Sequence, residues 1–189
     1  LERRDLFKKA NNISNEVDGL ETQEESFDEN IKISRVKVLN ENGEQAIGKR
    51  KGTYITIDIK NLKIAGEDQI QKASEAVTKE LKNLIGNLVG PQDDILVVGL
   101  GNLYVTPDAL GPKVVNEIDI TRHLLNYMPD VLDKDTRPVS AIAPGVLGTT
   151  GIETLEVIKG IVENIHPKLI IVIDALASRS IERISSTVQ

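Results

Sequence analysis

The chain has 189 residues, of which 40% are hydrophobic and 28% are charged, and its formal net charge is -6. This length supports one domain with a hydrophobic core, and the composition excludes a disordered chain. The absence of cysteine excludes disulfides, thiolate nucleophiles and Cys-ligated zinc, while the acidic balance argues against binding to nucleic acid or anionic lipid.

The sequence shows no segment directed to a membrane. No run approaches the roughly 18 to 20 consecutive apolar residues that span a bilayer, and no signal-peptide pattern opens the chain. We therefore expect a cytoplasmic protein without a membrane partner.

The first part of the chain differs from the rest in composition. Residues 11–30 are polar and acidic with few apolar side chains, which predicts a loop or a mobile segment. We therefore expect residues 1–30 to be mobile or partly ordered, and residues 31–189 to form the folded domain.

A pair of strands and a helix are predicted next. Runs rich in β-branched residues predict two neighbouring strands at residues 31–38 and 54–59. Apolar residues spaced by three and four predict a helix over residues 67–89, which Gly90 and Pro91 end.

The second half of the chain alternates strand, helix and strand. Nearly continuous apolar runs at residues 95–100 and 169–173 are typical of strands covered on both faces. An apolar stripe predicts a helix over residues 153–165 between them. This alternation predicts an α/β fold, with an open, mostly parallel sheet and helices on both faces.

Two aspartates follow the two apolar strands. Asp108 comes shortly after residues 95–100, and Asp174 directly follows residues 169–173. The carboxyl ends of parallel strands meet at one edge of a sheet, so we expect the two side chains to lie close together if their strands are neighbours. Two adjacent carboxyl groups can stay one ionised and one protonated, which supplies a base and an acid for activating water.

A structural role is the alternative for both aspartates. An aspartate between a strand and a helix is commonly an N-cap, and this interpretation fits Asp174 before Ala175 as well as Asp108 after Pro107. The residues alone leave the capping and the catalytic interpretations open.

Glycines and histidines give weaker signals. Gly99 and Gly101 lack the third glycine of a dinucleotide-binding fingerprint, which favours a strand-ending turn. The Gly/Thr segment at residues 145–151 can hold a peptide backbone or an anion, or can be a structural loop. His123 and His166 are the only histidines and lack the spacing of a zinc protease, so we expect neither a metal nor a cofactor.

Several ordered blocks of the sequence resemble the spore germination protease family. The blocks are Val97–Asn102, Val105–Pro112, Thr121–His123, Arg137–Ile142, Pro144–Val146, Thr150–Thr154, Ile173–Ala177 and Arg179–Arg183. The resemblance covers most of residues 31–189 and implies an aspartic-type endopeptidase. Its two essential aspartates correspond to Asp108 and Asp174, which favours the catalytic interpretation over capping.

The resemblance also implies a biological context. Members of this family are made as inactive zymogens, lose an N-terminal propeptide, assemble as homotetramers and digest small acid-soluble spore proteins during germination. A cytoplasmic location in the spore core follows. Family members continue beyond the position that matches Gln189, so the α/β peptidase domain at residues 31–189 is expected to be truncated at its C-terminal end.

Two other functions remain as alternatives. The string Gly-Leu-Gly-Asn, a following acidic residue with Leu-Gly, and a later strand-ending Asp-Ala also resemble the hydrogenase-maturation endopeptidases, which implies a similar fold and a nickel-dependent activity. A noncatalytic module that binds a peptide or an anion, with both aspartates as caps, is also compatible with the composition.

Overall fold

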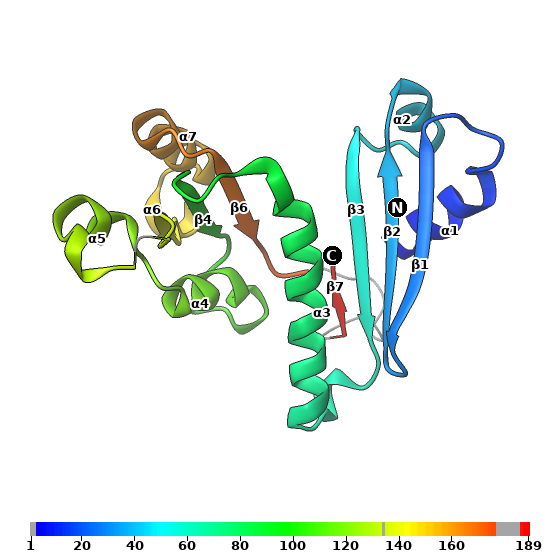
Figure 1. Cartoon of the computed structure of the whole chain (residues 1–189), viewed down its shortest axis with the longest axis horizontal. Helices are drawn as coiled ribbons and strands as arrows, with labels where there is room; N and C mark the ends of the chain where they lie inside the picture. Colours follow the sequence, from blue (N-terminus) through cyan, green and yellow to red (C-terminus); the bar gives the residue numbers. More distant parts are fainter. Residues whose placement is uncertain (1–2, 134, 177–185) are drawn as a thin grey trace. The chain divides into compact units, whose positions relative to one another are not determined.

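The computed structural model of the chain describes residues 3–133, 135–176 and 186–189 (Figure 1). The chain forms two compact units, one made of Leu1–Ile85 with Leu176–Gln189 and the other of Gly86–Ala175. The sequence was expected to form one domain after residue 30. Length and composition do not distinguish a chain with one compact unit from a chain with two, because 189 residues lie within the range of a single domain.

The first unit contains an antiparallel sheet of four strands in the order β1-β2-β3-β7. The strands are β1 (Leu20–Asp28), β2 (Ile31–Val38), β3 (Gly52–Ile59) and β7 (Thr187–Val188). The predicted pair of neighbouring strands is confirmed, because β2 pairs with β3 along its length with Ile33 opposite Ile57.

Strand β1 corrects the sequence analysis. The loop predicted for residues 11–30 is wrong at residues 11–13, which end helix α1 (Arg3–Ile13), and at residues 20–28, which pair with β2 over their length. The acidic residues that suggested a loop face cations across the strands, with Glu24 and Lys32 at 2.7 Å and Glu21 and Lys37 at 3.5 Å. Opposite charges on paired strands stabilise a sheet, so a polar run can form a strand.

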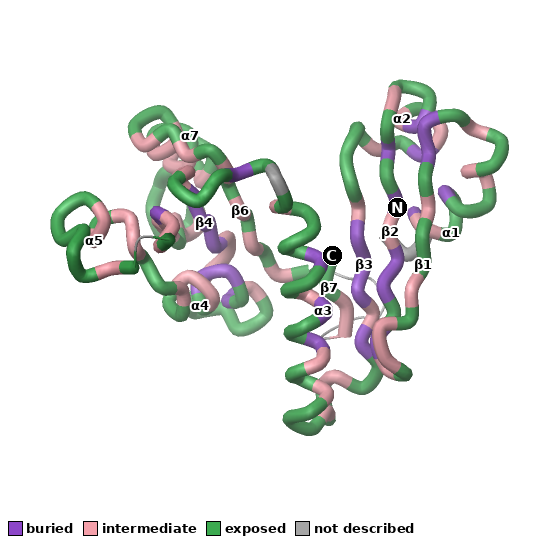
Figure 2. Tube along the Cα trace, viewed as in Figure 1, coloured by how far each residue is buried: buried purple, intermediate pink, exposed green. Residues whose placement is uncertain are grey.

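Both faces of this sheet are covered by helices. One face packs on helix α3 (Glu67–Ile85), and the other packs on α1 (Arg3–Ile13) and α2 (Glu41–Ile47). Residues buried on the α3 side are Ile31, Ile33, Ile55, Ile57, Ile59, Ala73 and Ala76. Those buried on the other side are Leu6, Ala10, Leu20, Val36, Val38 and Ile47. Strand β2 therefore contributes to both cores, with Ile31 and Ile33 buried on the α3 side and Val36 and Val38 buried on the other side (Figure 2).

The first predicted helix is confirmed except at its end. Helix α3 stops at Ile85, and a turn of 3-10 helix (Gly86–Leu88) follows, because Gly86 adopts a positive φ of 38° that interrupts the helix. None of the helices in the described ranges is long and apolar enough to cross a membrane.

The second unit contains a parallel sheet of three strands in the order β5-β4-β6. The strands are β4 (Ile95–Gly99), β5 (Val139–Ile142) and β6 (Leu169–Ile173). All five residues of the central strand β4 are buried. The two apolar strands predicted from the sequence are therefore confirmed, and they are neighbours.

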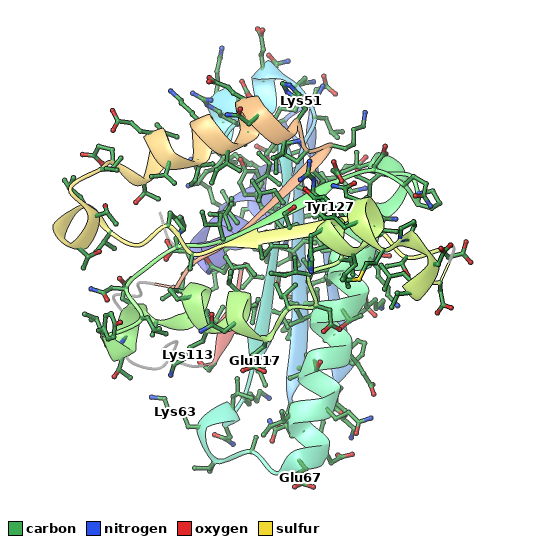
Figure 3. The ribbon with its side chains drawn as sticks, turned by 90° about the vertical axis from the view of Figure 1, so that its left-hand side faces the viewer. Lys51, Lys63, Glu67, Lys113, Glu117 and Tyr127 are labelled. Carbon is green, nitrogen blue, oxygen red and sulfur yellow. The ribbon has the colours of Figure 1, made fainter. Side chains whose placement is uncertain are left out.

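Helices lie on opposite sides of this parallel sheet. Helix α7 (Thr154–Ile165) lies on one side, as predicted for residues 153–165, and α4 (Leu110–Glu117), which carries the labelled Lys113 and Glu117, lies on the other (Figures 1 and 3). The shorter helical segments of this unit are 3-10 turns at Thr106–Asp108 and Pro129–Val131 and helices α5 (Arg122–Tyr127) and α6 (Leu147–Thr150).

The predicted fold class needs a partial correction. The protein is a mixed α/β structure, but its strands form one parallel and one antiparallel sheet rather than a single open, mostly parallel sheet. Apolar patterns show which residues form strands but not their direction, so the antiparallel pairing of β1, β2 and β3 was not visible in the sequence.

Candidate active site

Both predicted aspartates follow strands of the parallel sheet at its carboxyl edge. Asp108 ends the 3-10 turn Thr106–Asp108 after β4, and Asp174 comes directly after β6. Strands β4 and β6 are parallel neighbours. Beyond their ends the backbones stay in contact, because the N–H of Leu100 donates to the carbonyl of Ile173 at 2.8 Å. The structure therefore brings the two aspartate-bearing segments to the same edge.

The carboxylate of Asp108 is held by the loop that precedes it. The side chain is half-buried, and its Oδ2 accepts a hydrogen bond from the N–H of Asn102 at 2.8 Å. The same N–H lies 3.1 Å from the Asp108 carbonyl oxygen, and the Asp108 N–H donates to Val105 at 2.8 Å. A carboxylate with a fixed oxygen presents its remaining lone pairs in one direction.

Asp108 does not cap the helix that follows it. The N-cap position of α4 belongs to Ala109, and no side chain caps that helix end. The capping interpretation is therefore wrong for Asp108, because its carboxylate turns back to Asn102 instead of forward to the first turn of α4.

Asp174 has a different local environment. Its side chain is exposed, and Oδ1 accepts a hydrogen bond from the N–H of Ala175 at 2.8 Å. The capping alternative requires a helix that begins after Ala175, and residues 177–185 lie outside the described part of the chain.

Three glycines allow α4 to approach the strand ends closely. A Cβ atom at Gly99 would overlap the carbonyl of Gly111, and one at Gly111 would overlap the carbonyls of Leu100 and Ile173. Gly101 has a φ of 117°, which confirms the predicted strand-ending turn, and a Cβ there would overlap the carbonyl of Asp108. The edge that carries Asp108 is therefore built by backbone packed on backbone.

The Gly/Thr segment at residues 145–151 follows the third strand, β5, at the same edge. Its hydroxyl groups bond within the segment and to its flanks: Thr149 and Thr150 donate to the carbonyl of Val146 at 2.9 and 3.2 Å, and Thr154 donates to Gly145 at 3.1 Å. These contacts support the structural interpretation of this loop, because they fold the segment onto itself.

Neither histidine belongs to this edge. His166 is exposed, ends α7 and has a φ of 47°, while His123 is exposed in α5. Two residues before His123, Thr121 is hydrogen-bonded to the start of β5. Its hydroxyl accepts from the N–H of Val139 at 2.9 Å and donates to the Arg137 carbonyl. Within the described ranges, no group of three His, Asp or Glu side chains could hold a metal ion.

A cluster of ion pairs connects helix α3 to the sheet of the first unit. Arg35 on β2 donates to the buried Glu80 of α3 from Nε at 2.8 Å and from Nη2 at 2.6 Å, and to Glu25 at 2.8 Å. The bond to Glu80 raises the pKa of Arg35, and bonds from Lys79 and Arg35 lower the pKa of Glu25. This cluster joins α3 to the sheet and has a structural role.

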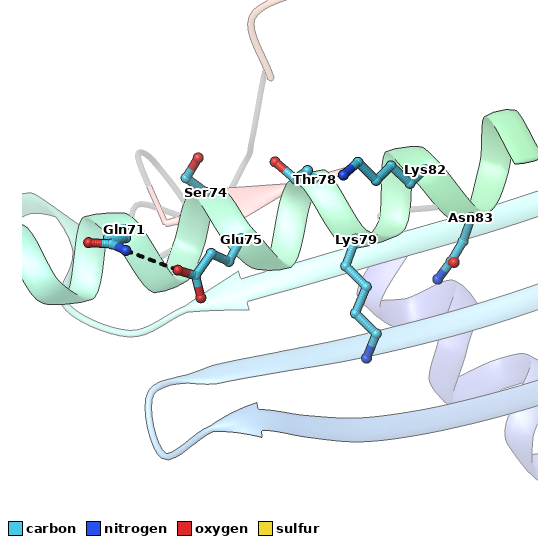
Figure 4. A pocket seen from close by; sticks show the side chains of 7 residues that line it. All are labelled: Gln71, Ser74, Glu75, Thr78, Lys79, Lys82 and Asn83. Atoms are coloured by element: carbon cyan, nitrogen blue, oxygen red, sulfur yellow. Dashed lines mark hydrogen bonds between the residues drawn. The ribbon is translucent and has the colours of Figure 1, made fainter. Parts of the chain in front are cut away.

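Two pockets in the described part of the first unit lie on and beside α3. One of about 520 Å³ follows the helix surface, where Gln71 donates to Glu75 at 3.1 Å (Figure 4). A second of about 450 Å³ contains the Arg35 cluster. Amide, hydroxyl and oppositely charged groups line both pockets, with Ile55 and Leu84 in the second, and neither Asp108 nor Asp174 belongs to this unit.

Sequence reasoning missed the role of Asn102. It bonds Asp108 through its backbone, so the side-chain chemistry gave no direct signal. The available signal was the residue type, because asparagine after a glycine in a tight loop commonly hydrogen-bonds the backbone two residues later.

Comparison with known proteins decides the family. The sequence profile of the family described as germination protease matches residues 1–189. The chain belongs to the germination protease family. A germination protease of Clostridium perfringens is 48% identical over all of this chain and 57% of its own length. That of Caldanaerobacter subterraneus is 50% identical over all of this chain and 56% of its own length. That of Priestia megaterium is 47% identical over 96% of this chain and 48% of its own.

The match to the germination protease family confirms the resemblance drawn from the sequence blocks. The chain spans about half the length of these relatives. What the family establishes directly is therefore kinship along the whole of this chain, over both compact units.

Proposed function

We propose that the protein is an endopeptidase that acts in spore germination, with Asp108 and Asp174 as its catalytic carboxylates. One structural observation carries the proposal beyond family membership: the two aspartates follow adjacent parallel strands at the same sheet edge. Carboxyl edges of parallel sheets are where α/β enzymes place their sites.

The proposed reaction is hydrolysis of a peptide bond by activated water. One carboxylate takes a proton from water as the oxygen attacks the peptide carbonyl, and the other carboxyl group, protonated, donates to the carbonyl oxygen or to the leaving amine. Asp108 suits such work because the N–H of Asn102 fixes one of its oxygens. The exposure of Asp174 gives a substrate access to its carboxylate.

The wider biological role follows from the family. We propose that the substrates are small acid-soluble spore proteins, that the enzyme is made as an autoprocessed zymogen, and that it works as a homotetramer in the spore core. Kinship along the whole chain favours this role over that of a nickel-dependent hydrogenase-maturation endopeptidase or a noncatalytic binding module.

The test is cleavage of a small acid-soluble spore protein by the full-length protein after removal of its proposed N-terminal propeptide. Asp108→Asn and Asp174→Asn should each lower kcat by about 100-fold or more, because a positioned acid or base contributes roughly 10²- to 10⁴-fold. Asp130→Asn is the matched control, since Asp130 is exposed in the same unit but lies in the 3-10 turn Pro129–Val131.

Folding must be checked in the same samples. Amide hydrogen exchange of β4 should be unchanged in all three variants if they fold as the parent does. Folded Asp108→Asn and Asp174→Asn proteins that cleave as fast as the parent would show that the carboxylate pair is not the catalytic group.

A further inference from the structure

Asn102 is the centre of the hydrogen bonds in the loop between β4 and Asp108. Its side-chain Oδ1 accepts from the N–H of Tyr104 at 3.0 Å, and its carbonyl accepts from the N–H of Val105 at 3.0 Å. Its own N–H donates to Asp108, to Oδ2 at 2.8 Å and to the carbonyl at 3.1 Å. One residue therefore connects the start of the loop with its end.

These bonds are mutually dependent. The bond from Tyr104 to the Asn102 side chain closes a turn that mimics a backbone turn, and this turn brings Val105 back to the Asn102 carbonyl. The Asp108 N–H in turn donates to Val105. The side chain of Asn102 thus acts on Asp108 through the path that the backbone takes between them.

Apolar packing contributes little to holding this loop. Leu103, Tyr104 and Val105 are 43%, 90% and 44% exposed. Loops with exposed side chains keep their conformation through local hydrogen bonds and backbone restrictions. Here these are the Asn102 contacts and the close approach of Gly101 to the Asp108 carbonyl.

We infer that Asn102 is a positioning residue for Asp108, acting through the loop without touching the substrate. The inference rests on the proposed function, because it assigns Asn102 a task in the same reaction. The inference predicts that weakening the turn lowers kcat and leaves KM nearly unchanged. The Asp108 carboxylate would move, while the contacts between enzyme and substrate would be preserved.

The experiment compares three variants of the full-length protein after removal of its proposed propeptide. Asn102→Ala removes the acceptor, and we expect kcat to fall roughly 10- to 100-fold, because a small misplacement of a reacting group can cost about 10²-fold. Asn102→Ser keeps a shorter acceptor for the Tyr104 N–H and should recover part of this loss. Asn116→Ala is the control, since Asn116 is exposed on α4 and should keep the parent kcat.

A second measurement does not depend on peptidase activity. Amide hydrogen exchange at Asn102 and Tyr104 should accelerate in Asn102→Ala, while β4 amides keep the parent rate. The inference would be overturned if Asn102→Ala had the same kcat as the parent, whether or not its KM rises. This holds even if Asp108→Asn is inactive. If the processed parent cleaves nothing, the proposed function fails and the inference, which rests on it, fails too. Unchanged exchange at both amides in Asn102→Ala would overturn the inference even when the parent is active.

Discussion

Replacing Glu80 by Gln tests how strongly the buried charge cluster stabilises the first unit. The Glu80 side chain is 4% exposed and binds two nitrogens of Arg35 through both carboxylate oxygens. A Gln amide offers one oxygen in place of two and turns an NH2 group toward a guanidinium that can only donate. The substitution therefore removes a charge and one acceptor while preserving the shape of the side chain.

We expect the free energy of unfolding of this unit to fall by about 2 to 3 kcal/mol. Breaking a buried ion pair costs roughly 3 to 5 kcal/mol when the remaining charge is left without a partner. Arg35 keeps its contact with Glu25 at 2.8 Å, which lowers this cost. For a unit of about 100 residues, such a loss corresponds to a Tm lower by roughly 10 to 20 °C.

Amide hydrogen exchange of β2 and β3 measures this stability, since both strands belong to the unit in question. Glu21→Gln is the matched control, because Glu21 pairs with Lys37 at 3.5 Å with both side chains more than half exposed. Exposed pairs contribute little, so the control should lose less than about 1 kcal/mol. Equal losses in the two variants would refute the reasoning.

Two further predictions concern acid stability and helix packing. Because Lys79 and Arg35 hold the pKa of Glu25 below its ordinary value of 4.5, the stability that ionised Glu25 contributes is complete above that value and is lost as the pH falls through the folded pKa. Acid titration of the parent and of Glu25→Gln should show a smaller loss of stability below pH 4.5 in the variant, and identical curves would contradict the assignment. Gly111→Ala should destabilise the second unit by about 1 to 3 kcal/mol, because its Cβ meets two carbonyl groups. Gly160→Ala, with open space in the middle of α7, should stabilise it by roughly 0.5 to 1 kcal/mol; denaturant unfolding checks both, and equal effects would show that the close approach of α4 is not tight.

Elements of the parallel sheet were accessible from the sequence because their signals are local. Strand β6 has the predicted bounds, β4 ends one residue before the prediction, and α7 begins one residue after it. Continuous apolar runs and helical spacing are properties of single segments. The bounds of β1 were not accessible in this way, because its acidic residues find their partners on β2 and α3, which are distant segments of the chain.

The candidate site shows the same division between local and distant information. Its edge could be predicted from the positions of Asp108 and Asp174 after two apolar strands, given parallel pairing. The hydrogen bond from the Asn102 N–H to the Asp108 carboxylate could not be predicted, because it depends on the conformation of the loop and joins backbone to side chain. Whether Asp174 also caps a helix depends on residues outside the described ranges.

The backbone contact between Leu100 and Ile173 has a consequence for how this family can change over time. The spacing between the segments that carry Asp108 and Asp174 depends on main-chain atoms and on glycines without side chains, not on particular apolar residues in β4 and β6. Apolar side chains of similar volume can replace one another in a core at small cost. The interior of the sheet can therefore diverge among relatives while the glycines and the strand pairing preserve the spacing of its two acidic segments.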